Sequence, residues 1–330
     1  MGYMIGVDVG GTFTDFSVFD SETKRLFHYK HSSTPDDPSR SIVSGIHYIL
    51  ESEGIDPVAV EYLAHGTTVA TNALIEKRGA RMGLITTKGF KDLMEIGNQK
   101  RPSLYDLLKE KPESLIPSGL KCEVEERLLH DGSVKIPLNE EDVRKAVRFF
   151  QEQNVTTIAV CTLFSFINPA HERRIKEIIL EEYPEAYVSI SSELVSEFRE
   201  YSRMSTTVLN AYLGPVMKKY VENFQNSVRE SGIAVAPYVT QSNGSIISIA
   251  ETVECPIKTA VSGPSAGVVG ATYIGRQCGI DKIITFDMGG TSADISLIKD
   301  GKAQVSYERM VEGYPARIPM IDIITVSYTH

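Results

Sequence analysis

The sequence predicts an α/β protein with two domains, and three observations support this prediction. Apolar segments of strand length alternate with polar loops and amphipathic helices through residues 60–190, which is typical of an α/β layer. Residues 5–19 and 284–298 each read as an apolar strand, a glycine turn and a second strand. A chain of 330 residues is long enough for two cores of ordinary size. We therefore expect domains at residues 1–185 and 186–330.

The first domain is predicted to begin with three antiparallel strands followed by a helix. Residues 5–9 and 13–19 pair around the first glycine turn, and residues 26–31 supply the third strand. An Asp-Asp-Pro sequence then gives a start signal for a helix over residues 39–53.

Strands and helices alternate after this helix. A short strand at residues 60–64 leads into the polar turn 65–68, and a helix follows up to Arg78. Residues 81–86 read as the next strand. Residues 99–131 contain several prolines and predict an irregular surface connection.

A second α/β block follows, and it ends in a long helix. Residues 139–153 predict a helix capped by Asn139, and the apolar residues 157–164 predict a strand. Residues 202–230 read mostly as one helix that Pro215 breaks or kinks. The remaining expected elements are a helix from Pro169 to about residue 183, strands at 187–190 and 237–240, and a helix of small residues from 262 to 278.

Composition and charge narrow the classes of function. Hydrophobic residues make up 42% and charged residues 23% of the chain, which is typical of a globular protein. The formal charge of -9 argues against a nucleic-acid or anionic-membrane partner, because both favour a basic surface. No apolar run reaches the roughly 18 residues of a membrane helix, and no basic leader precedes the first strand. We therefore expect a cytoplasmic protein that acts on a small molecule.

The four cysteines are scattered, without a C-x-x-C pair or zinc-ligand spacing to histidine. We expect reduced, structural thiols. Cys161 lies in an apolar strand, where a buried cysteine behaves as a small hydrophobe.

An Asp-x-Gly-Gly-Thr sequence occurs at both predicted hairpins in matching frame. Adjacent glycines bring backbone N–H groups close to phosphate oxygens, and the threonine hydroxyl adds a donor. The predicted phosphate-binding residues are Gly10, Gly11, Thr12, Gly289, Gly290 and Thr291. Asp8 and Asp287, at the ends of their strands, are candidates for holding Mg2+ directly or through water. Each copy alone fits an ordinary hairpin turn, whereas two matching copies favour a nucleotide site.

This pair of hairpins, with a helix of small residues before the second, resembles the actin, hexokinase and heat-shock-chaperone ATPase superfamily. The resemblance implies two ribonuclease-H-like domains of the actin-like ATPase type. It also implies that the second is truncated, because a glycine-rich adenosine-binding turn normally follows the second hairpin, whereas this sequence stops at His330.

Within that superfamily the chain resembles the hydantoinase/oxoprolinase family over nearly its whole length. The segments that carry the resemblance are residues 10–15 (Gly-Gly-Thr-Phe-Thr-Asp), 65–73 (His-Gly-Thr-Thr-Val-Ala-Thr-Asn-Ala), 199–203 (Arg-Glu-Tyr-Ser-Arg), 205–212 (Ser-Thr-Thr-Val-Leu-Asn-Ala-Tyr), 241–244 (Gln-Ser-Asn-Gly), 262–264 (Ser-Gly-Pro) and 286–292 (Phe-Asp-Met-Gly-Gly-Thr-Ser). The resemblance implies ATP and Mg2+ as cofactors. ATP would phosphorylate the amide oxygen of a cyclic amide, and water would then open the ring.

Several residues are candidates for catalysis or substrate binding. Asp15 and Asp294 follow the two turns, where each is placed to orient water or metal or to accept hydrogen bonds from the turn backbone. His65 is a candidate general acid or base, with a structural hydrogen bond as the alternative. The candidate substrate contacts are Thr67, Thr68, Asn72, Arg199, Arg203 and Asn243. The arginines suit a substrate carboxylate or a surface ion pair, and Asn243 suits a substrate contact or a left-handed turn position.

Three functions follow from these motifs. The first is an ATP-dependent hydrolase of a hydantoin or 5-oxoproline ring, or its N-terminal part, working as a homo-oligomer or with a partner subunit. The second is an ATP-binding subunit of a multi-subunit ketone carboxylase, or an inactive fragment. The third, a sugar or acetate kinase, shares only the hairpins and is disfavoured by the segments at residues 65–73 and 199–212.

Overall fold

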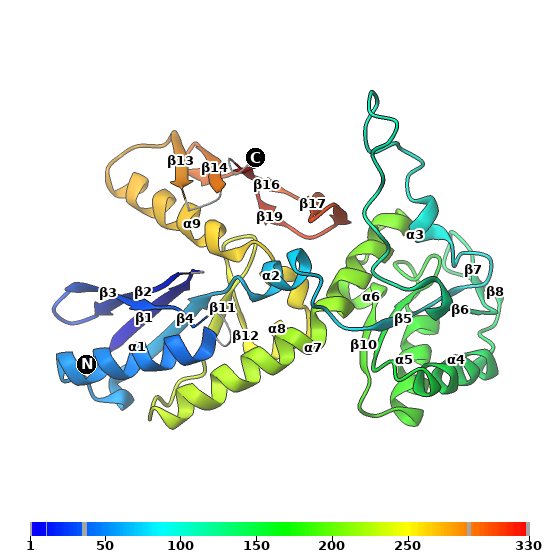
Figure 1. Cartoon of the computed structure of the whole chain (residues 1–330), viewed down its shortest axis with the longest axis horizontal. Helices are drawn as coiled ribbons and strands as arrows, with labels where there is room; N and C mark the ends of the chain where they lie inside the picture. Colours follow the sequence, from blue (N-terminus) through cyan, green and yellow to red (C-terminus); the bar gives the residue numbers. More distant parts are fainter. Residues whose placement is uncertain (1, 11, 35–37, 289–291, 328–330) are drawn as a thin grey trace. The chain divides into compact units, whose positions relative to one another are not determined.

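The computed structural model describes residues 2–10, 12–34, 38–288 and 292–327. The chain divides into two compact units (Figure 1), each built from separate stretches of sequence. Unit 1 comprises Met1–Ala73, Met217–Tyr307 and Pro319–His330, and unit 2 comprises Leu74–Val216 and Glu308–Ile318. Both hairpins lie in unit 1. The domain boundary predicted from the sequence, between residues 185 and 186, assigned them to separate domains.

Unit 1 contains a six-stranded mixed sheet with the order β12-β11-β4-β1-β2-β3. The strands are β1 (Tyr3–Val9), β2 (Phe13–Asp20), β3 (Leu26–Ser32), β4 (Val60–Gly66), β11 (Tyr238–Thr240) and β12 (Ile246–Ser248). β1, β2 and β3 are antiparallel, as predicted, whereas β1, β4 and β11 run parallel. In β1 and β2 every second residue is buried, because strand side chains alternate between the two faces.

Helix α1 (Pro38–Glu53) packs on the buried face of this sheet through Ile42, Ile46 and Ile49 (Figure 1). Gly45 lies on the same side of α1, directly against the ring of Phe16 from β2. A Cβ atom added at Gly45 would lie 2.2 Å from Cζ of Phe16, which is 1% exposed. The glycine therefore permits the helix to approach the sheet closely.

We expect Gly45→Val to lower the free energy of unfolding of unit 1 by about 1–3 kcal/mol, because the added methyl groups overpack a filled core. Gly270→Ala is the matched control, since this helical glycine has no neighbour within 4 Å of its added Cβ. The control should be neutral or stabilising by about 1 kcal/mol through helix propensity alone. Urea unfolding followed by circular dichroism measures both, and equal effects of the two substitutions would contradict the packing argument.

The second hairpin forms a separate antiparallel sheet in unit 1. Its strands are β13 (Ile283–Met288), β14 (Ser292–Lys299), β15 (Lys302–Ala303) and β20 (Ile323–Ser327). Helix α9 (Ser262–Gln277) packs against one face of this sheet, where Val268 joins the buried side chains of Ile298, Ile321 and Ile323. Unit 1 also contains α8 (Ile249–Glu254), β16 (Val305–Ser306) and β19 (Met320–Ile321).

Unit 2 contains a four-stranded parallel sheet with the order β10-β9-β5-β6. Its strands are β5 (Met82–Thr87), β6 (Lys121–Val124), β9 (Thr157–Cys161) and β10 (Tyr187–Ile190). The expected burial of Cys161 is confirmed. The prediction that residues 99–131 form only irregular structure is wrong at β6. This edge strand carries polar residues, so its sequence lacks the continuous apolar pattern of β5 and β9.

Helices α4 (Glu140–Glu152) and α5 (Ala170–Glu182) pack with the sheet of unit 2, and each begins within a residue of its predicted start. The remaining elements of the chain are α2 (Val69–Ile75), α3 (Leu93–Ile96), α6 (Ser191–Leu194), α7 (Glu200–Glu230), β7 (Arg127–Leu128), β8 (Val134–Ile136), β17 (Arg309–Val311), β18 (Tyr314–Ala316) and three short 3-10 turns. Pro215 does not end α7, which continues on both sides of it. Among the helices described, none combines the length and hydropathy of a membrane-spanning segment.

Candidate functional site

The parallel strands β1, β4 and β11 end at the same edge of the unit 1 sheet. Asp8 of β1 is paired with Gly66 of β4, and Thr240 is the last residue of β11. Helix α9 begins at this edge, where the Ser262 hydroxyl donates to the carbonyl of Thr67 over 3.2 Å. Carboxyl ends of parallel strands and free N–H groups at a helix start are the usual elements of an anion site.

The Asp8 carboxylate occupies space that two glycines leave open. A Cβ atom at Gly66 would lie 3.2 Å from Asp8 Oδ1 and 3.4 Å from Thr240 Oγ1, and one at Gly263 would lie 3.9 Å from Asp8 Oδ1. Thr240 Oγ1 is buried and has no hydrogen-bond partner among the described residues. A free hydroxyl and a carboxylate therefore converge beside the first turn of α9.

The pKa of Asp8 is raised from its ordinary value, although the residue reaches solvent. Partial desolvation by the surrounding protein is the largest cause, and the charges of Asp15 and Asp287 add to it. Asp15 lies opposite Asp8 in the register of the first hairpin, and Asp287 belongs to the second hairpin. The charge of Asp287, the smallest of these three causes, connects the second hairpin electrostatically with Asp8.

The first turn is closed by polar contacts that the motif did not predict. The Gly10 N–H donates to the carbonyl of Phe13 over 3.0 Å, and the Ser33 hydroxyl donates to the Gly10 carbonyl over 2.8 Å. The Ser33 N–H also donates to the carbonyl of Thr12 over 2.9 Å. A Cβ atom at Gly10 would lie 2.9 Å from the Phe13 carbonyl oxygen, so this position requires glycine. Gly11 lies outside the described residues.

In the second hairpin Asp287 is paired with Asp294 across β13 and β14. Asp294 accepts a hydrogen bond of 2.6 Å from the Thr325 hydroxyl, which fixes one of its oxygens. A cavity of about 340 Å³ between α9 and this hairpin has both carboxylates in its lining. The predicted phosphate contacts Gly289, Gly290 and Thr291 lie outside the described residues.

The carboxylates of Asp8 and Asp287 suit a Mg2+ ion that keeps most of its water ligands. No group of three or more His, Cys, Asp or Glu side chains with metal-site geometry occurs in the part of the chain that the structure describes. Mg2+ does not need such a cage, since it keeps several waters and takes one or two carboxylates. Asp15 is engaged by Lys30 at 3.2 Å, which leaves Asp8 and Asp287 as the better candidates. A divalent cation would relieve the repulsion between these two.

His65 does not face this site. The side chain is 1% exposed, its Nδ1–H donates to the Gly66 carbonyl over 2.8 Å, and Nε2 lies 3.3 Å from the hydroxyl of Tyr220. The rings of Tyr220 and Phe224 from α7 pack edge-on against the imidazole. Desolvation lowers the pKa of His65 to about 4. This environment supports the structural alternative and argues against the role of general acid or base.

We expect His65 to make the stability of unit 1 depend on pH between about 4 and 6.5. The unfolded chain binds a proton at the ordinary pKa of 6.5, whereas the folded chain binds it only near 4, so stability falls as pH drops through this window. At 1.36 kcal/mol per pH unit the loss is about 3 kcal/mol. Urea unfolding at several pH values tests this. His65→Asn should flatten the curve, while the exposed-site control His130→Asn should keep its parental shape.

The polar residues after His65 serve the local backbone. Thr67 is buried, and its hydroxyl accepts the Val69 N–H at the start of α2 over 3.1 Å. Thr68 accepts a long hydrogen bond of 3.4 Å from the side chain of Asn72, which is exposed. Thr67 therefore acts as a helix cap, and of the three substrate contacts predicted here only Thr68 and Asn72 remain accessible.

The two predicted substrate arginines lie in unit 2, in different environments. Arg203 is fully buried and donates to Ser191 Oγ over 2.9 Å, to the Thr162 carbonyl over 2.8 Å and to Ser165 Oγ. A substrate cannot reach it, so the prediction of carboxylate binding by Arg203 is wrong. Arg199 is exposed and lies 3.6 Å from Glu308, which matches the surface-ion-pair alternative.

Asn243 forms a local turn. Its Oδ1 accepts hydrogen bonds from the N–H and hydroxyl of Ser245, at 2.9 and 2.7 Å. The left-handed position in this turn is Gly244, with φ of +81°, and not Asn243. The turn is anchored because the Ser242 N–H donates to the Lys258 carbonyl over 2.7 Å.

Comparison with known proteins identifies the family. The profile described as the hydantoinase/oxoprolinase N-terminal region matches residues 4–183, and the profile described as hydantoinase/oxoprolinase matches residues 203–329. The chain belongs to the hydantoinase/oxoprolinase family. The resemblance that the sequence motifs predicted is thereby confirmed.

Relatives and solved structures of this family match nearly the whole chain. Caprolactamase subunit alpha of Pseudomonas jessenii is 36% identical over 332 residues, covering 98% of this chain and 47% of the relative. 5-oxoprolinase 1 of Arabidopsis thaliana is 33% identical, covering 97% of this chain and 27% of the relative. The chain thus spans about half the length of the first relative and about a quarter of the second.

Two solved structures share the fold. The crystal structure of the ATP-dependent caprolactamase from Pseudomonas jessenii superimposes with a TM-score of 0.89 at 35% identity, covering 98% of this chain and 48% of that one. The nucleotide-free structure of acetone carboxylase gives a TM-score of 0.88 at 26% identity, covering 99% and 48%. The α/β fold of this family is therefore present along the whole described chain.

Proposed function

We propose that this chain carries the ATP-binding part of a hydrolase that opens a cyclic amide ring. The observation that carries the proposal is the convergence of Asp8, Thr240 and the start of α9, with the Asp287 charge acting on Asp8. The strand order β3-β2-β1-β4-β11 with an antiparallel start supports a ribonuclease-H-like domain of the actin-like ATPase type. Relatives named as ATP-dependent caprolactamase and 5-oxoprolinase support the cyclic-amide class.

The residues of the site take these roles in the proposal. The two Asp-x-Gly-Gly-Thr sequences would bind phosphate oxygens, in the first copy through N–H groups other than that of Gly10, and Asp8 and Asp287 would hold Mg2+. Mg2+ held there would neutralise charge on the transferred phosphoryl group. The amide oxygen attacks the γ-phosphorus and ADP leaves. A first water then adds to the activated carbon, and the C–N bond breaks with the proton going to the leaving nitrogen, which leaves an acyl phosphate. A second water hydrolyses the acyl phosphate to the carboxylate and phosphate. In the proposal Asp294, which accepts a hydrogen bond from Thr325, orients the first water.

A second function is favoured by one comparison. The acetone carboxylase structure covers this chain as completely as the caprolactamase structure does, so an ATP-binding subunit of a ketone carboxylase is the alternative. The caprolactamase relative is named as a subunit, which supports a partner subunit for this chain as well.

Phosphate release from Mg-ATP tests the proposal. We expect release that depends on caprolactam, 5-oxoproline or hydantoin, with the ring-opened amino acid formed in equal amount. Release stimulated only by a ketone with bicarbonate would support the carboxylase subunit, and phosphate transfer to a sugar would support a kinase. Asp8→Asn is the control for background hydrolysis, because it removes a proposed metal ligand and leaves the fold of β1 in place.

A further inference from the structure

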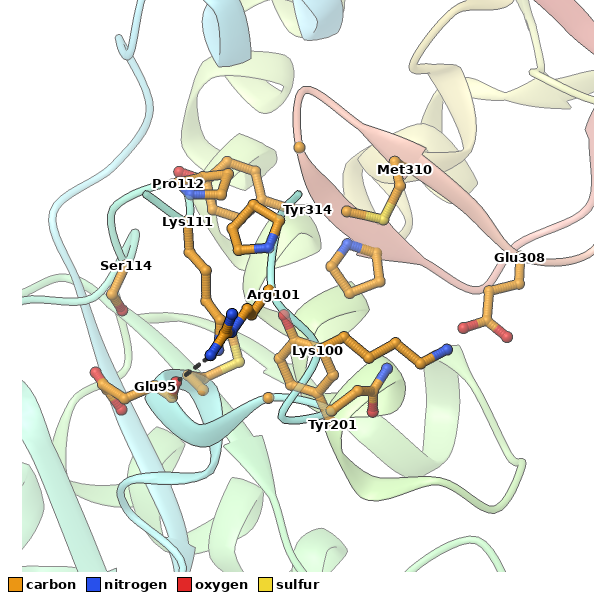
Figure 2. A pocket seen from close by; sticks show the side chains of 16 residues that line it. Glu95, Lys100, Arg101, Lys111, Pro112, Ser114, Tyr201, Glu308, Met310 and Tyr314 are labelled. Atoms are coloured by element: carbon orange, nitrogen blue, oxygen red, sulfur yellow. Dashed lines mark hydrogen bonds between the residues drawn. The ribbon is translucent and has the colours of Figure 1, made fainter. Parts of the chain in front are cut away.

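Unit 2 contains a cavity of about 470 Å³ that the proposed ATP chemistry does not use (Figure 2). Three segments line it and leave it open to solvent: the stretch from α3 through the following loops, the first turn of α7 at Tyr201, and the β17–β18 hairpin. All lining residues belong to unit 2, whereas both glycine hairpins belong to unit 1. A volume of this size lies within the range of pockets for small organic ligands.

Contacts among these three segments hold the walls of the cavity together. The Tyr314 hydroxyl of the β17–β18 hairpin donates to the Glu113 carbonyl over 2.7 Å. The turn of the same hairpin packs on the loop, since a Cβ atom at Gly313 would lie 2.6 Å from Cγ of Pro112. Lys111 Nζ donates to the carbonyl of Ile96 over 3.3 Å, which ties the loop to the end of α3. These contacts fix the β17–β18 hairpin against the loops, so the shape of the cavity is defined by packed and hydrogen-bonded residues.

The lining carries an excess of positive charge. Lys100, Arg101 and Lys111 line the cavity, and neither Lys100 nor Arg101 makes an ion pair within the described residues. The two acidic lining residues are already neutralised from outside the cavity. Glu95 pairs with Lys121, and Glu308 lies 3.6 Å from Arg199 and 4.0 Å from Arg317.

Most of the remaining lining is apolar, with Asn98 and Ser114 as its polar members. Met94, Met310, Tyr201 and three prolines form the walls, and burial raises the pKa of the Tyr201 and Tyr314 hydroxyls, so both stay neutral. Figure 2 shows Met310 and Tyr314 on the hairpin side and Lys100 and Arg101 on the loop side. An apolar wall beside two free cations suits a molecule with an apolar body and one anionic end.

We propose that this cavity binds a small organic carboxylate with an apolar body. The Arg101 guanidinium receives the carboxylate, Lys100 adds a second positive charge, and the methionine and tyrosine side chains cover the hydrocarbon part. The proposal stands apart from the proposed ATP chemistry, because it depends on no residue of either glycine hairpin.

Binding of 4-phenylbutyrate and of its neutral amide to the full 330-residue chain, measured by calorimetry, tests the proposal. We expect the acid to bind at least about tenfold more tightly than the amide, because only the acid forms charge-assisted hydrogen bonds. The double charge reversal K100E/R101E should abolish this preference. The matched control K91E/K109E changes net charge equally, at two lysines that do not line the cavity, and should leave it intact.

Met310→Ser tests the apolar wall without changing charge. It should weaken the binding of acid and amide alike, by about threefold or more, because less apolar surface is covered. The proposal is overturned if the acid does not bind at millimolar concentration, if acid and amide bind equally, or if K100E/R101E binds the acid as the parent does. Asp8→Asn should not alter acid binding. Failure of the proposed ATP site and failure of the proposed carboxylate site can therefore be distinguished.

Discussion

The Asp8→Asn variant is expected to bind Mg-ATP at least about 100-fold more weakly than the parent chain. Removal of the outer hydrogen-bond partners of a metal ligand already costs roughly 10- to 100-fold in metal affinity, and Asp8 is a proposed ligand itself. In the parent, the negative charges of Asp15 and Asp287 repel the Asp8 carboxylate, and a bound cation would relieve this repulsion. Asparagine is similar in size, so it removes this charge without filling the space above Gly66.

Calorimetric titration of Mg-ATP into parent and variant measures this effect. Glu61→Gln is the matched control, because Glu61 is an exposed carboxylate near the amino end of β4, at the opposite edge of the same sheet. The control should bind as the parent does. An Asp8→Asn variant with parental affinity, or a folded parent that binds no nucleotide, would contradict the proposed site.

The first hairpin and its third antiparallel strand were predictable because their signals are local. Alternating burial in β1 and β2 follows directly from the apolar residues at every second position. The repeat of Asp-x-Gly-Gly-Thr identifies Asp8 and Asp287 from residue order alone. The parallel pairing of β4 and β11 with β1, which brings Gly66 and Thr240 to Asp8, depends on long-range packing and has no local signal.

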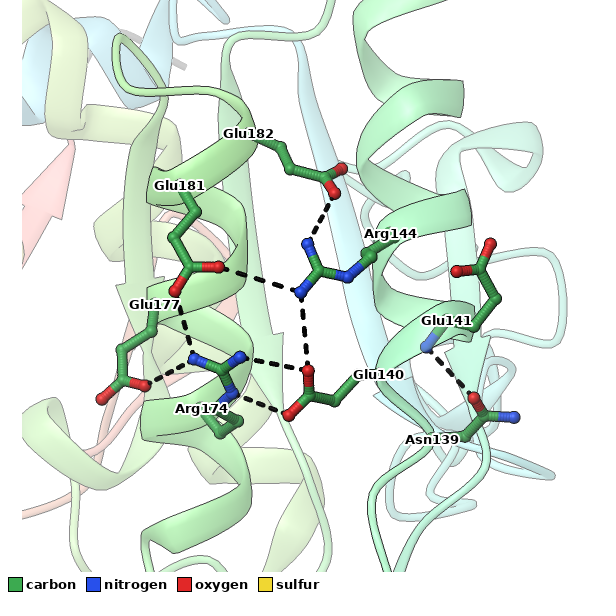
Figure 3. Close-up of polar contacts among 8 residues, drawn as sticks. All are labelled: Asn139, Glu140, Glu141, Arg144, Arg174, Glu177, Glu181 and Glu182. Carbon is green, nitrogen blue, oxygen red and sulfur yellow. Dashed lines mark hydrogen bonds and ion pairs between the residues drawn. The ribbon is translucent and has the colours of Figure 1, made fainter.

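The ion pairs between α4 and α5 illustrate the same limit (Figure 3). The sequence predicted both helices, and the charged residues on them were evident. That Arg174 meets Glu140 at 2.8 Å, and Arg144 meets Glu182 at 2.7 Å, follows from how the helices pack side by side. Residue type alone gives the charges of the two helices and does not give their register.

The error at Arg203 has a related cause. Two arginines around a tyrosine at a helix start suit a substrate anion equally well whether they face solvent or the core. Arg203 instead turns inward to the carboxyl ends of β9 and β10, where Ser191 links it to the buried carboxylate of Glu172. Arginine side chains are seldom fully buried unless they are paired, so the residue type alone predicted an exposed side chain at position 203.

Arg203→Met is expected to lower the free energy of unfolding of unit 2 by about 3–5 kcal/mol, because it leaves the buried charge of Glu172 uncompensated. Glu172 is 0% exposed, and its oxygens accept the N–H groups of Thr162 and Ser192 at 2.8 Å. Arg199→Met is the matched control at the same helix start. Its exposed ion pair with Glu308 predicts a loss of about 0–1 kcal/mol.

The double variant Arg203→Met with Glu172→Gln separates charge from packing. The amide introduced by Glu172→Gln carries no charge and still accepts one of the two backbone N–H groups. If the cost of Arg203→Met comes from an uncompensated carboxylate, the double variant should therefore be more stable than Arg203→Met alone. Urea unfolding of the parent, the two single variants and the double variant gives the coupling free energy. A coupling of zero would mean that lost packing against Phe166 accounts for the effect. A variant of parental stability with weaker substrate binding would restore Arg203 as a substrate contact.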